Sequence, residues 1–228
     1  MTRTLLITGG CGFIGANFVR RILREYPDYR VINLDKLTYA GNLANLADIE
    51  GDERYRFVHG EIADVDTVDP LVAEADCIVN FAAESHVDRS ILGSADFLHT
   101  NIHGTYVLLD AARRHGVERF HQISTDEVYG SIDEGHWDES YPMEPRNPYS
   151  ATKASAELLV RAFHLSHGVP TVVTRASNNI GPYQYPEKRV PLYVTNAMDD
   201  LPLPVYGDGM QVRDHLYVDD HCSAIDLV

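Results

Sequence analysis

A glycine-rich turn between a strand and a helix constrains the fold of this chain more than any other feature. Residues 4–8 are apolar and largely β-branched, and over residues 13–22 the apolar side chains recur at helical spacing. Gly9, Gly12 and Gly15 occupy the turn between these segments. Such a turn brings backbone N–H groups and a helix N-terminus against a pyrophosphate. The sequence therefore predicts a strand–turn–helix unit that binds a dinucleotide.

Strands and helices alternate along the rest of the chain. Helical apolar spacing predicts helices over about 96–115 and 149–167, with Gly116 as a C-terminal cap. Strands separated by helices are typical of an α/β fold with a doubly wound parallel sheet of the Rossmann type. Short apolar segments bounded by turn residues predict the further strands at 30–34, 56–59, 77–81, 119–124 and 171–176.

We divide the chain into two parts. Residues 1–180 carry the alternating pattern and are expected to form a Rossmann-type NAD-binding domain with the catalytic residues. Beyond them, prolines break the chain into short pieces around one helix near 192–198. We expect residues 181–228 to begin a smaller substrate-binding region. The chain ends at Val228 inside an apolar helix without a C-terminal cap, which we interpret as a truncated end.

The composition indicates an ordinary globular protein. A net charge of −15 lacks the basic field that nucleic acids and anionic membranes require. The acid-rich, lysine-poor balance fits salt adaptation and a GC-rich genome equally well. No segment is apolar enough to span a membrane, and no secretory pattern opens the chain. Cys11, Cys77 and Cys222 lie far apart without metal-ligand spacing, so we expect packing thiols in a reducing, cytoplasmic compartment.

An acidic residue ends the second predicted strand. Asp35 lies 20 residues after Gly15, where a carboxylate binds the hydroxyls of an adenosine ribose. The same carboxylate repels a 2′-phosphate, so the sequence favours NAD over NADP, although Lys36 beside it partly offsets that repulsion. A glycine turn of purely structural use is the alternative.

Tyr149 and Lys153 form a Tyr-x-x-x-Lys pair at the start of a predicted helix, so both side chains share one face. A phenol with a reference pKa of about 10 is a weak base at neutral pH. An adjacent ammonium and a nicotinamide cation favour the phenolate, and Lys153 can also hold the cofactor ribose. We therefore expect this pair to transfer a proton beside the nicotinamide.

The segment Ser-Thr-Asp-Glu-Val-Tyr-Gly at 124–130, together with Tyr-Ser-Ala-Thr-Lys at 149–153, carries a family resemblance. The chain resembles the extended short-chain dehydrogenase/reductase family, and within it the dTDP-glucose 4,6-dehydratases. Epimerases of this superfamily share the glycine turn and the Tyr-x-x-x-Lys pair but usually lack the acidic pair. Asp126 and Glu127 therefore favour dehydration, and a solvated acidic turn is the alternative. Further similar segments are 9–15, 35–42, 82–90, 177–179, 186–188 and 213–214.

The resemblance implies NAD-dependent conversion of a nucleoside-diphosphate-glucose, most closely dTDP-glucose, into a 4-keto-6-deoxy sugar nucleotide. It assigns Tyr149 to the 4-hydroxyl proton as hydride leaves C4, and Thr125 to holding that oxygen. It assigns Glu127 to removing the C5 proton and a protonated Asp126 to the departing 6-hydroxyl. Hydride return to C6 regenerates tightly bound NAD⁺. Neighbouring carboxyls split their pKa values, which supplies one acid and one base.

The resemblance also implies binding residues and a homodimer formed by the helices near 100–115 and 150–167. His86 fits a core position as well as a substrate contact. The implied substrate contacts are Ser85, Thr125, Asn179, Lys188 and Arg213, with the last two as diphosphate cations. The implied cofactor contacts are Gly9, Gly12, Phe13, Ile14, Gly15, Asp35, Lys36, Leu37, Thr38, Glu61, Ile62, Phe81, Ala82, Ala83, Ser85, Thr100, Tyr149, Lys153 and Asn178.

The chain departs from the family pattern in two positions and in length. Glu61 stands where the family usually has Asp near the adenine, and His215 stands where an aromatic residue is typical. Family members continue further and complete the nucleotide pocket there. Three hypotheses compete with the dTDP-glucose reaction: a sugar-nucleotide 4-epimerase, a UDP-glucose 4,6-dehydratase and a non-catalytic NAD-binding fragment.

Overall fold

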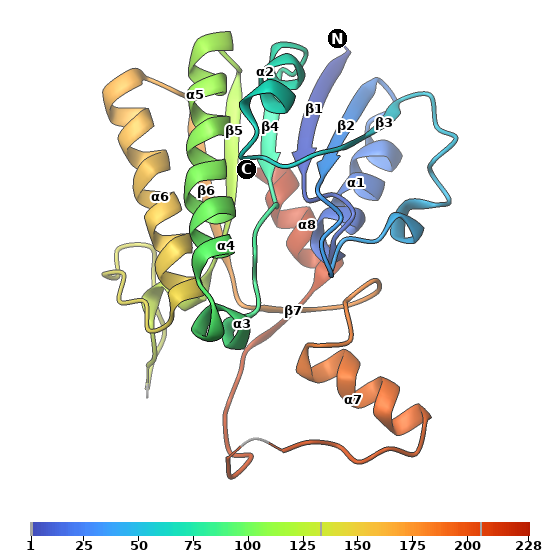
Figure 1. Ribbon diagram of the computed structural model, residues 1–228, viewed down its shortest axis with the longest axis vertical. Coiled ribbons are helices and arrows are strands. Elements are labelled where there is room, and N and C mark those ends of the chain that lie inside the picture. The colour runs from blue at the N-terminus through green and yellow to red at the C-terminus, as the bar shows by residue number, and fades with distance from the viewer. Residues whose placement is uncertain (1, 133, 206) are drawn as a thin grey trace.

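The computed structural model describes residues 2–132, 134–205 and 207–228. The strands are β1 (Arg3–Thr8), β2 (Tyr29–Asp35), β3 (Tyr55–His59), β4 (Cys77–Asn80), β5 (Arg119–Thr125), β6 (Thr171–Ala176), β7 (Asn178–Ile180) and β8 (His215–Tyr217). Six of them form a parallel sheet in the order β3-β2-β1-β4-β5-β6 (Figure 1). The chain moves outward from β1 to β3, crosses back to β4 and moves outward again. This is the predicted doubly wound topology.

Helices cover both faces of the sheet (Figure 1). The longer ones are α1 (Phe13–Glu25), α2 (Val65–Ala73), α5 (Thr105–His115), α6 (Pro148–His167), α7 (Arg189–Met198) and α8 (Val218–Leu227). The shorter ones are η1 (Leu43–Leu46), α3 (Val87–Leu92), α4 (Ala95–Phe97), the π-helix η2 (Leu98–Gly104) and η3 (Asp126–Tyr129). Helices α2, α5 and α6 pack side by side, and α1 packs against α8. None of the helices in the described ranges is both long and apolar enough to cross a bilayer.

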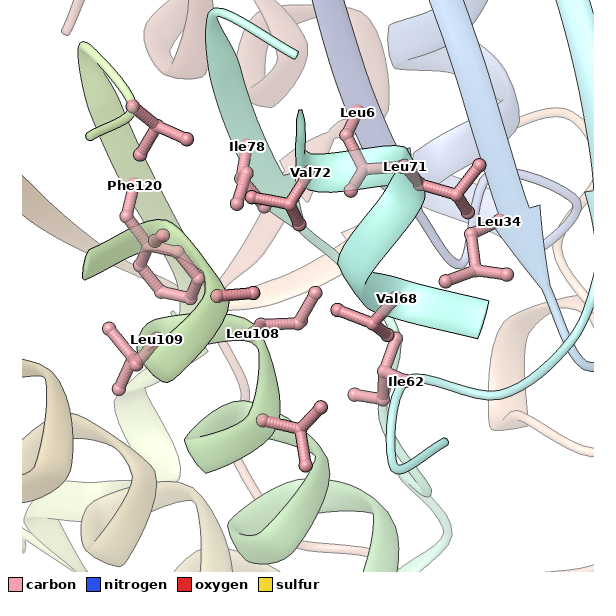
Figure 2. Close-up of a cluster of buried hydrophobic side chains, with 14 of the residues drawn as sticks. Leu6, Leu34, Ile62, Val68, Leu71, Val72, Ile78, Leu108, Leu109 and Phe120 are labelled. Atoms are coloured by element: carbon pink, nitrogen blue, oxygen red, sulfur yellow. The ribbon is translucent and has the colours of Figure 1, made fainter. Parts of the chain in front are cut away.

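Two apolar clusters fix the helices to the sheet. Along β1, Leu6 belongs to the cluster with α2 and α5, whereas Leu5 and Ile7 belong to the cluster with α1 and α8. This division follows from the alternation of side chains along a strand. Figure 2 shows the first cluster, in which Leu108 of α5 and Phe120 of β5 lie with no exposed surface.

The predicted elements occur close to their expected positions. Each strand predicted in residues 1–180 is present, with its bounds within one residue. The helix expected over about 96–115 is a continuous run of α4, η2 and α5. Gly116 ends it with φ 69°, and its N–H donates to the carbonyl of Ala112. Helices α2 and α3 were not predicted, because Pro70 interrupts the helical pattern of α2 and α3 is six residues long.

The two helices of residues 181–228 lie in different places. Helix α7 lies away from the sheet, beyond the carboxyl ends of its strands, and β8 pairs with β7 (Figure 1). Helix α8 then returns to the sheet, where Val218, Cys222 and Ile225 are buried in the cluster that holds Leu5 and Ile7. It returns because it covers an apolar face of the sheet together with α1. Helix α8 thus packs on the sheet formed by residues 1–180, and the division of the chain into two parts stays a prediction.

Candidate active site

A cavity of about 850 Å³ lies at the carboxyl ends of the sheet strands. Its walls come from the glycine turn after β1, the segments after β2, β3 and β4, the end of β5, the first turns of α6, Thr100 of η2 and parts of residues 176–221. Ligands of doubly wound sheets bind at this edge, where the strand order reverses between β1 and β4. The predicted catalytic residues all line this cavity: Thr125, Asp126, Glu127, Tyr149 and Lys153.

The three glycines of the turn differ in what surrounds them. A Cβ on Gly9, whose φ is 70°, would lie 2.7 Å from the backbone nitrogen of Ala82. A Cβ on Gly15 would lie 2.3 Å from the carbonyl oxygen of Gly9. Packing within the protein therefore requires both glycines. A Cβ on Gly12, the N-cap of α1, would meet only the Gly9 oxygen at 3.3 Å. Gly12 lines the cavity, so its missing side chain leaves room for a phosphate at the helix N-terminus.

Asp35 connects the glycine turn to the segment after β2. Its carboxylate accepts hydrogen bonds from the backbone N–H of Cys11 at 2.9 Å and of Leu37 at 2.8 Å. Burial raises the pKa of Asp35, and these two bonds oppose the rise. Lys36 pairs with Glu61, whose pKa is lowered by that contact. Because Lys36 pairs with Glu61, its charge offsets the repulsion between Asp35 and a 2′-phosphate less than expected.

Tyr149 and Lys153 lie in the first turns of α6 and are almost fully buried. Burial lowers the pKa of Lys153 to about 8, and its Nζ donates to the carbonyl of Ile123 at 2.7 Å. Burial raises the pKa of Tyr149, and the charge of Glu127 raises it further. The expectation that the lysine and a nicotinamide cation together favour the phenolate stays a prediction, because the protein by itself raises the pKa of the phenol. The ammonium is held by a carbonyl, while burial and nearby carboxylates disfavour the charged phenol.

The acidic pair lies in η3, the turn that follows β5. Thr125 is its N-cap: the hydroxyl donates to Asp126 Oδ1 at 3.2 Å and accepts from the backbone N–H of Glu127 at 3.2 Å. Burial raises the pKa of Asp126, the Thr125 bond opposes the rise, and the charge of Glu127 adds to it. Burial thus favours the protonated form of Asp126, and the role of acid expected for it stays a prediction.

A buried polar network supports this turn from behind. Ser124 Oγ donates to Glu157 Oε1 at 2.5 Å, and Arg175 Nε lies 3.0 Å and 3.1 Å from the two oxygens of the same carboxylate. Arg175 also donates to the hydroxyl of Tyr129 at 2.5 Å. Glu157 lies one helical turn after Lys153 on α6. The network therefore ties β5, β6, η3 and α6 together beneath the cavity.

The predicted substrate residues Ser85, Thr125, Asn179, Lys188 and Arg213 also line the cavity. Lys188 Nζ donates to the carbonyl of Ser85 at 3.2 Å, and Arg213 is exposed and donates to the carbonyl of Val212. The side chain of Asn179 accepts from His221 at 2.9 Å and donates to the carbonyl of Ser177 at 3.0 Å. The amide of Asn179 therefore already has two hydrogen-bond partners within the protein.

The predicted cofactor residues also gather at the cavity, with one exception. Leu37 does not line it, because its side chain packs against the apolar cluster beneath α1. Asn178 is exposed, and its side-chain nitrogen lies 3.4 Å from the carbonyl of Asp214. Those that line the cavity are Gly9, Gly12, Phe13, Ile14, Gly15, Asp35, Lys36, Thr38, Glu61, Ile62, Phe81, Ala82, Ala83, Ser85, Thr100, Tyr149, Lys153 and Asn178.

The cysteines behave as packing residues. All three carry free thiols, and Cys11 and Cys222 are buried. Burial raises the pKa of Cys11 to about 12, with the charge of Asp35 adding to the effect. Burial likewise raises the pKa of Cys222 to about 12. A thiol with a raised pKa forms little of the nucleophilic thiolate, which fits the packing role expected for Cys11.

Comparison with known proteins identifies the family of this chain. The sequence profile described as GDP-mannose 4,6 dehydratase matches residues 6–228. The dTDP-glucose 4,6-dehydratase of Streptomyces niveus is 57% identical over 228 residues, which cover 98% of this chain and 68% of that relative. The chain belongs to the nucleotide-sugar 4,6-dehydratase family. The resemblance to extended short-chain dehydrogenase/reductases expected from the sequence is thereby confirmed.

Solved structures of this family and of its neighbours share the fold. DesIV, a dTDP-glucose 4,6-dehydratase from Streptomyces venezuelae solved with NAD bound, has a TM-score of 0.96 at 54% identity over 99% of this chain and 71% of its own. The UDP-glucuronic acid 4-epimerase of Bacillus cereus has a TM-score of 0.91 at 29% identity over 96% of this chain and 70% of its own. The epimerase thus shares the architecture but is more distant in sequence than the dehydratases of the family.

His86 lies beside this 4,6-dehydratase-family site, and several cavity residues had no role assigned from the sequence. His86, left open between two roles, caps α3: its Nδ1 accepts from the backbone N–H of Arg89, and its Nε2 lies 3.7 Å from Glu187. No local pattern marks the others, because the tertiary fold alone brings them to the cavity. They are Gln184, Tyr185, Arg189, Tyr193, Gln211 and His221, whereas Glu84 and Glu187 belong to family-like segments and His215 was noted as a departure from the family pattern.

Proposed function

We propose that this chain acts as an NAD-dependent dTDP-glucose 4,6-dehydratase, converting the sugar nucleotide to its 4-keto-6-deoxy form. The acidic turn with Asp126 and Glu127, beside Tyr149 in one cavity, carries the proposal. A phenol and a lysine suffice for hydride chemistry, whereas loss of water needs an additional acid and base. The relatives named above as dTDP-glucose 4,6-dehydratases support it, and the 4-epimerase is a more distant neighbour.

The residues around the glycine turn fit NAD. Gly12 leaves the space that a pyrophosphate needs at the N-terminus of α1, and Asp35 provides a carboxylate for the adenosine ribose. Glu61 beside Lys36 keeps this end of the cavity from presenting a free cation to a 2′-phosphate. When bound, NAD⁺ would take a hydride from C4 of the sugar, supply a cationic ring that favours the Tyr149 phenolate, and return the hydride to C6.

Oxidation at C4 requires removal of the 4-hydroxyl proton, and we assign this to Tyr149. The hydroxyl of Tyr149 lies near the hydroxyl of Thr125, and both residues line the cavity. We assign Thr125 to holding the same 4-oxygen of the sugar. Lys153 is fixed by the Ile123 carbonyl and lines the cavity, where its ammonium can hold the ribose next to the nicotinamide. The two residues thus divide proton transfer and cofactor positioning.

Loss of water across C5 and C6 requires a base at C5 and an acid at the 6-hydroxyl. The 4-ketone acidifies the C5 proton, which we assign to the carboxylate of Glu127. Asp126, whose pKa is raised by burial, then gives its proton to the departing hydroxyl, which leaves as water. The electron pair of the C5–H bond becomes the C5–C6 double bond, and when the hydride returns to C6 the proton held by Glu127 goes back to C5.

The nucleotide end of the substrate needs cations. Lys188 and Arg213, two of the cavity cations, are proposed to meet the diphosphate, with Ser85 and Asn179 contacting the substrate between them and the sugar. Thymine is proposed as the base because the Streptomyces niveus relative and the solved DesIV are named as dTDP-glucose 4,6-dehydratases. Competition between dTDP-glucose and UDP-glucose in one reaction measures this preference.

The test of the proposed function is turnover of dTDP-glucose with NAD, followed by the alkaline absorbance of a 4-keto-6-deoxy product. Glu127→Gln should still form NADH from dTDP-glucose but should slow product formation by roughly 10²–10⁴-fold, the usual contribution of a general base. Glu139→Gln, the same change at an exposed position, is the matched control. A product that retains the 6-hydroxyl would indicate epimerisation, and NAD binding without NADH formation would indicate a non-catalytic module.

We also propose that the protein is a homodimer in the cytoplasm. Helix η2, together with α5 and α6, exposes large apolar side chains, including Leu98 at 51%, Leu158 at 54% and Leu165 at 71%. A second copy that brings the same helices together would cover them. Light scattering should give twice the chain mass, and Leu158→Glu should give the monomer.

The cytoplasm holds the proposed NAD and nucleotide sugar and suits free thiols, and fractionation of cells tests this location.

A further inference from the structure

Asn147 joins the start of the catalytic helix to the acidic turn. It is the N-cap of α6, and its Oδ1 accepts a hydrogen bond from the backbone N–H of Ser150 at 2.8 Å. Its Nδ2 donates to Glu127 Oε2 at 3.2 Å. Tyr149 follows two residues later on the same helix. One side chain therefore contacts both the carboxylate assigned to C5 and the helix that carries the phenol assigned to C4.

The orientation of this amide is determined by its partners. A backbone N–H can only donate, so the atom facing Ser150 must be the oxygen of Asn147. The capping box is completed by the Ser150 hydroxyl, which accepts from the backbone N–H of Asn147 at 3.2 Å. The NH₂ group of Asn147 consequently points at Glu127 in the only arrangement that satisfies both ends.

Glu127 lies close to two other groups of the proposed reaction, Asp126 and Tyr149. Asp126 lies beside it in η3, and the charge of Glu127 raises the pKa of both Asp126 and Tyr149. The neutral N–H of Asn147 is a donor to this carboxylate that costs no proton and brings no charge near the phenol. Hydrogen bonds to charged groups are stronger than those between neutral groups and fix direction as well.

We propose that Asn147 is a positioning residue that orients the carboxylate of Glu127 for removal of the C5 proton. This inference deepens the proposed dehydratase function and rests on it. The amide holds one carboxylate oxygen and leaves the other available to the substrate. Because Asn147 is also the cap of α6, the base and the Tyr149 phenol keep a fixed separation.

Two substitutions separate this role from capping. Asn147→Ser keeps an N-cap oxygen but removes the N–H that faces Glu127. Asn147→Asp also keeps the cap, and a carboxylate at a helix N-terminus is favourable for the helix, but it places a second negative charge against Glu127. If Asn147 only caps the helix, the Asp variant should exchange the C5 proton as fast as wild type. If Asn147 orients Glu127, the rate of C5 exchange should fall in the order Asn, Ser, Asp.

The experiment measures the two chemical steps of the NAD-loaded enzyme with dTDP-glucose. NADH formation reports C4 oxidation, and deuterium uptake at C5 from heavy water reports the Glu127 step. Asn147→Ser should lower C5 exchange by about tenfold and Asn147→Asp by more, while NADH formation changes by less than about twofold. Thermal unfolding should show that neither variant has lost its fold. Equal loss of both steps, or an Asp variant as fast as wild type, would overturn the proposal.

A second measurement does not depend on turnover. A double-mutant cycle between Asn147→Ser and Glu127→Ala, read by urea unfolding, should give a coupling of about threefold to tenfold in the unfolding equilibrium constant. No coupling would refute the contact even in an active enzyme. If coupling is present but wild type forms no NADH from dTDP-glucose, the proposed substrate is wrong and the positioning contact stands.

Discussion

Two buried histidines should make the fold sensitive to acid. His121 on β5 and His221 on α8 each expose 4% of their surface. Burial lowers the pKa of each from 6.5 to about 4. His121 contacts the hydroxyl of Thr174 at 3.0 Å, and His221 contacts the amide oxygen of Asn179 at 2.9 Å. Protonation would therefore place a positive charge in surroundings that solvate it poorly.

The sign and size of the effect follow from proton linkage. The unfolded chain takes up these protons as the pH falls below 6.5, whereas the folded chain takes them up only near pH 4. Stability is complete above pH 6.5 and falls between these two values. Each histidine should remove about 3 kcal/mol, since one pKa unit is worth about 1.4 kcal/mol. Asp35, Glu84 and Asp126, whose pKa values burial raises, act in the opposite direction and stabilise the fold as the pH falls.

The assay is urea unfolding between about pH 7 and pH 4.5, with wild type compared to the double variant His121→Gln, His221→Asn. The comparison of the two pH slopes removes the contribution of the carboxyls. Wild type should lose several kcal/mol more than the double variant across this range. His167→Gln, at the exposed end of α6, is the control and should follow wild type. Parallel slopes for wild type and the double variant would refute the reasoning.

The glycine turn and the buried network give two further predictions. Gly12→Ala should weaken NAD binding at least about tenfold in titration calorimetry with an unchanged urea midpoint, whereas Gly15→Ala should cost about 1–3 kcal/mol of stability because its Cβ meets a backbone oxygen. A similar loss of stability in both variants would contradict the assignment of Gly12 to NAD binding and of Gly15 to packing. Arg175→Leu should cost about 3–5 kcal/mol because it leaves the buried Glu157 unpaired, and adding Glu157→Leu should restore most of it. A neutral single variant would show that the pair adds nothing.

Local sequence patterns predicted the sheet because its strands are short, apolar and bounded by turn residues. They predicted Gly9, Asp35, Tyr149 and Lys153 as site residues because parallel strands bring the segments after them to one edge of the sheet. The same reasoning could not place Leu37, which turns away from the cavity into the apolar cluster. Its sequence position is right, but the direction of its side chain depends on packing.

Electrostatic expectations were less secure than positional ones. The spacing of Tyr149 and Lys153 correctly placed both in the cavity, but it did not show that the ammonium would bind the Ile123 carbonyl. Asn147 was missed for a related reason. A helix start beside a proline marks a cap, but the contact with Glu127, twenty residues earlier, exists only after β5 and α6 pack together.

The return of α8 to the sheet has a consequence for how the chain acquires its fold during synthesis. Arg21 and Tyr26 on α1 and just after it bind Asp226 of α8, which is synthesised 205 and 200 residues after them. Until then, the face of β1 that carries Leu5 and Ile7 has α1 but not α8 against it. A nascent chain therefore has an incompletely covered sheet until α8 is synthesised, and the docking of α8 joins residues of high sequence separation. Chaperones that shield apolar surface should matter most during that interval.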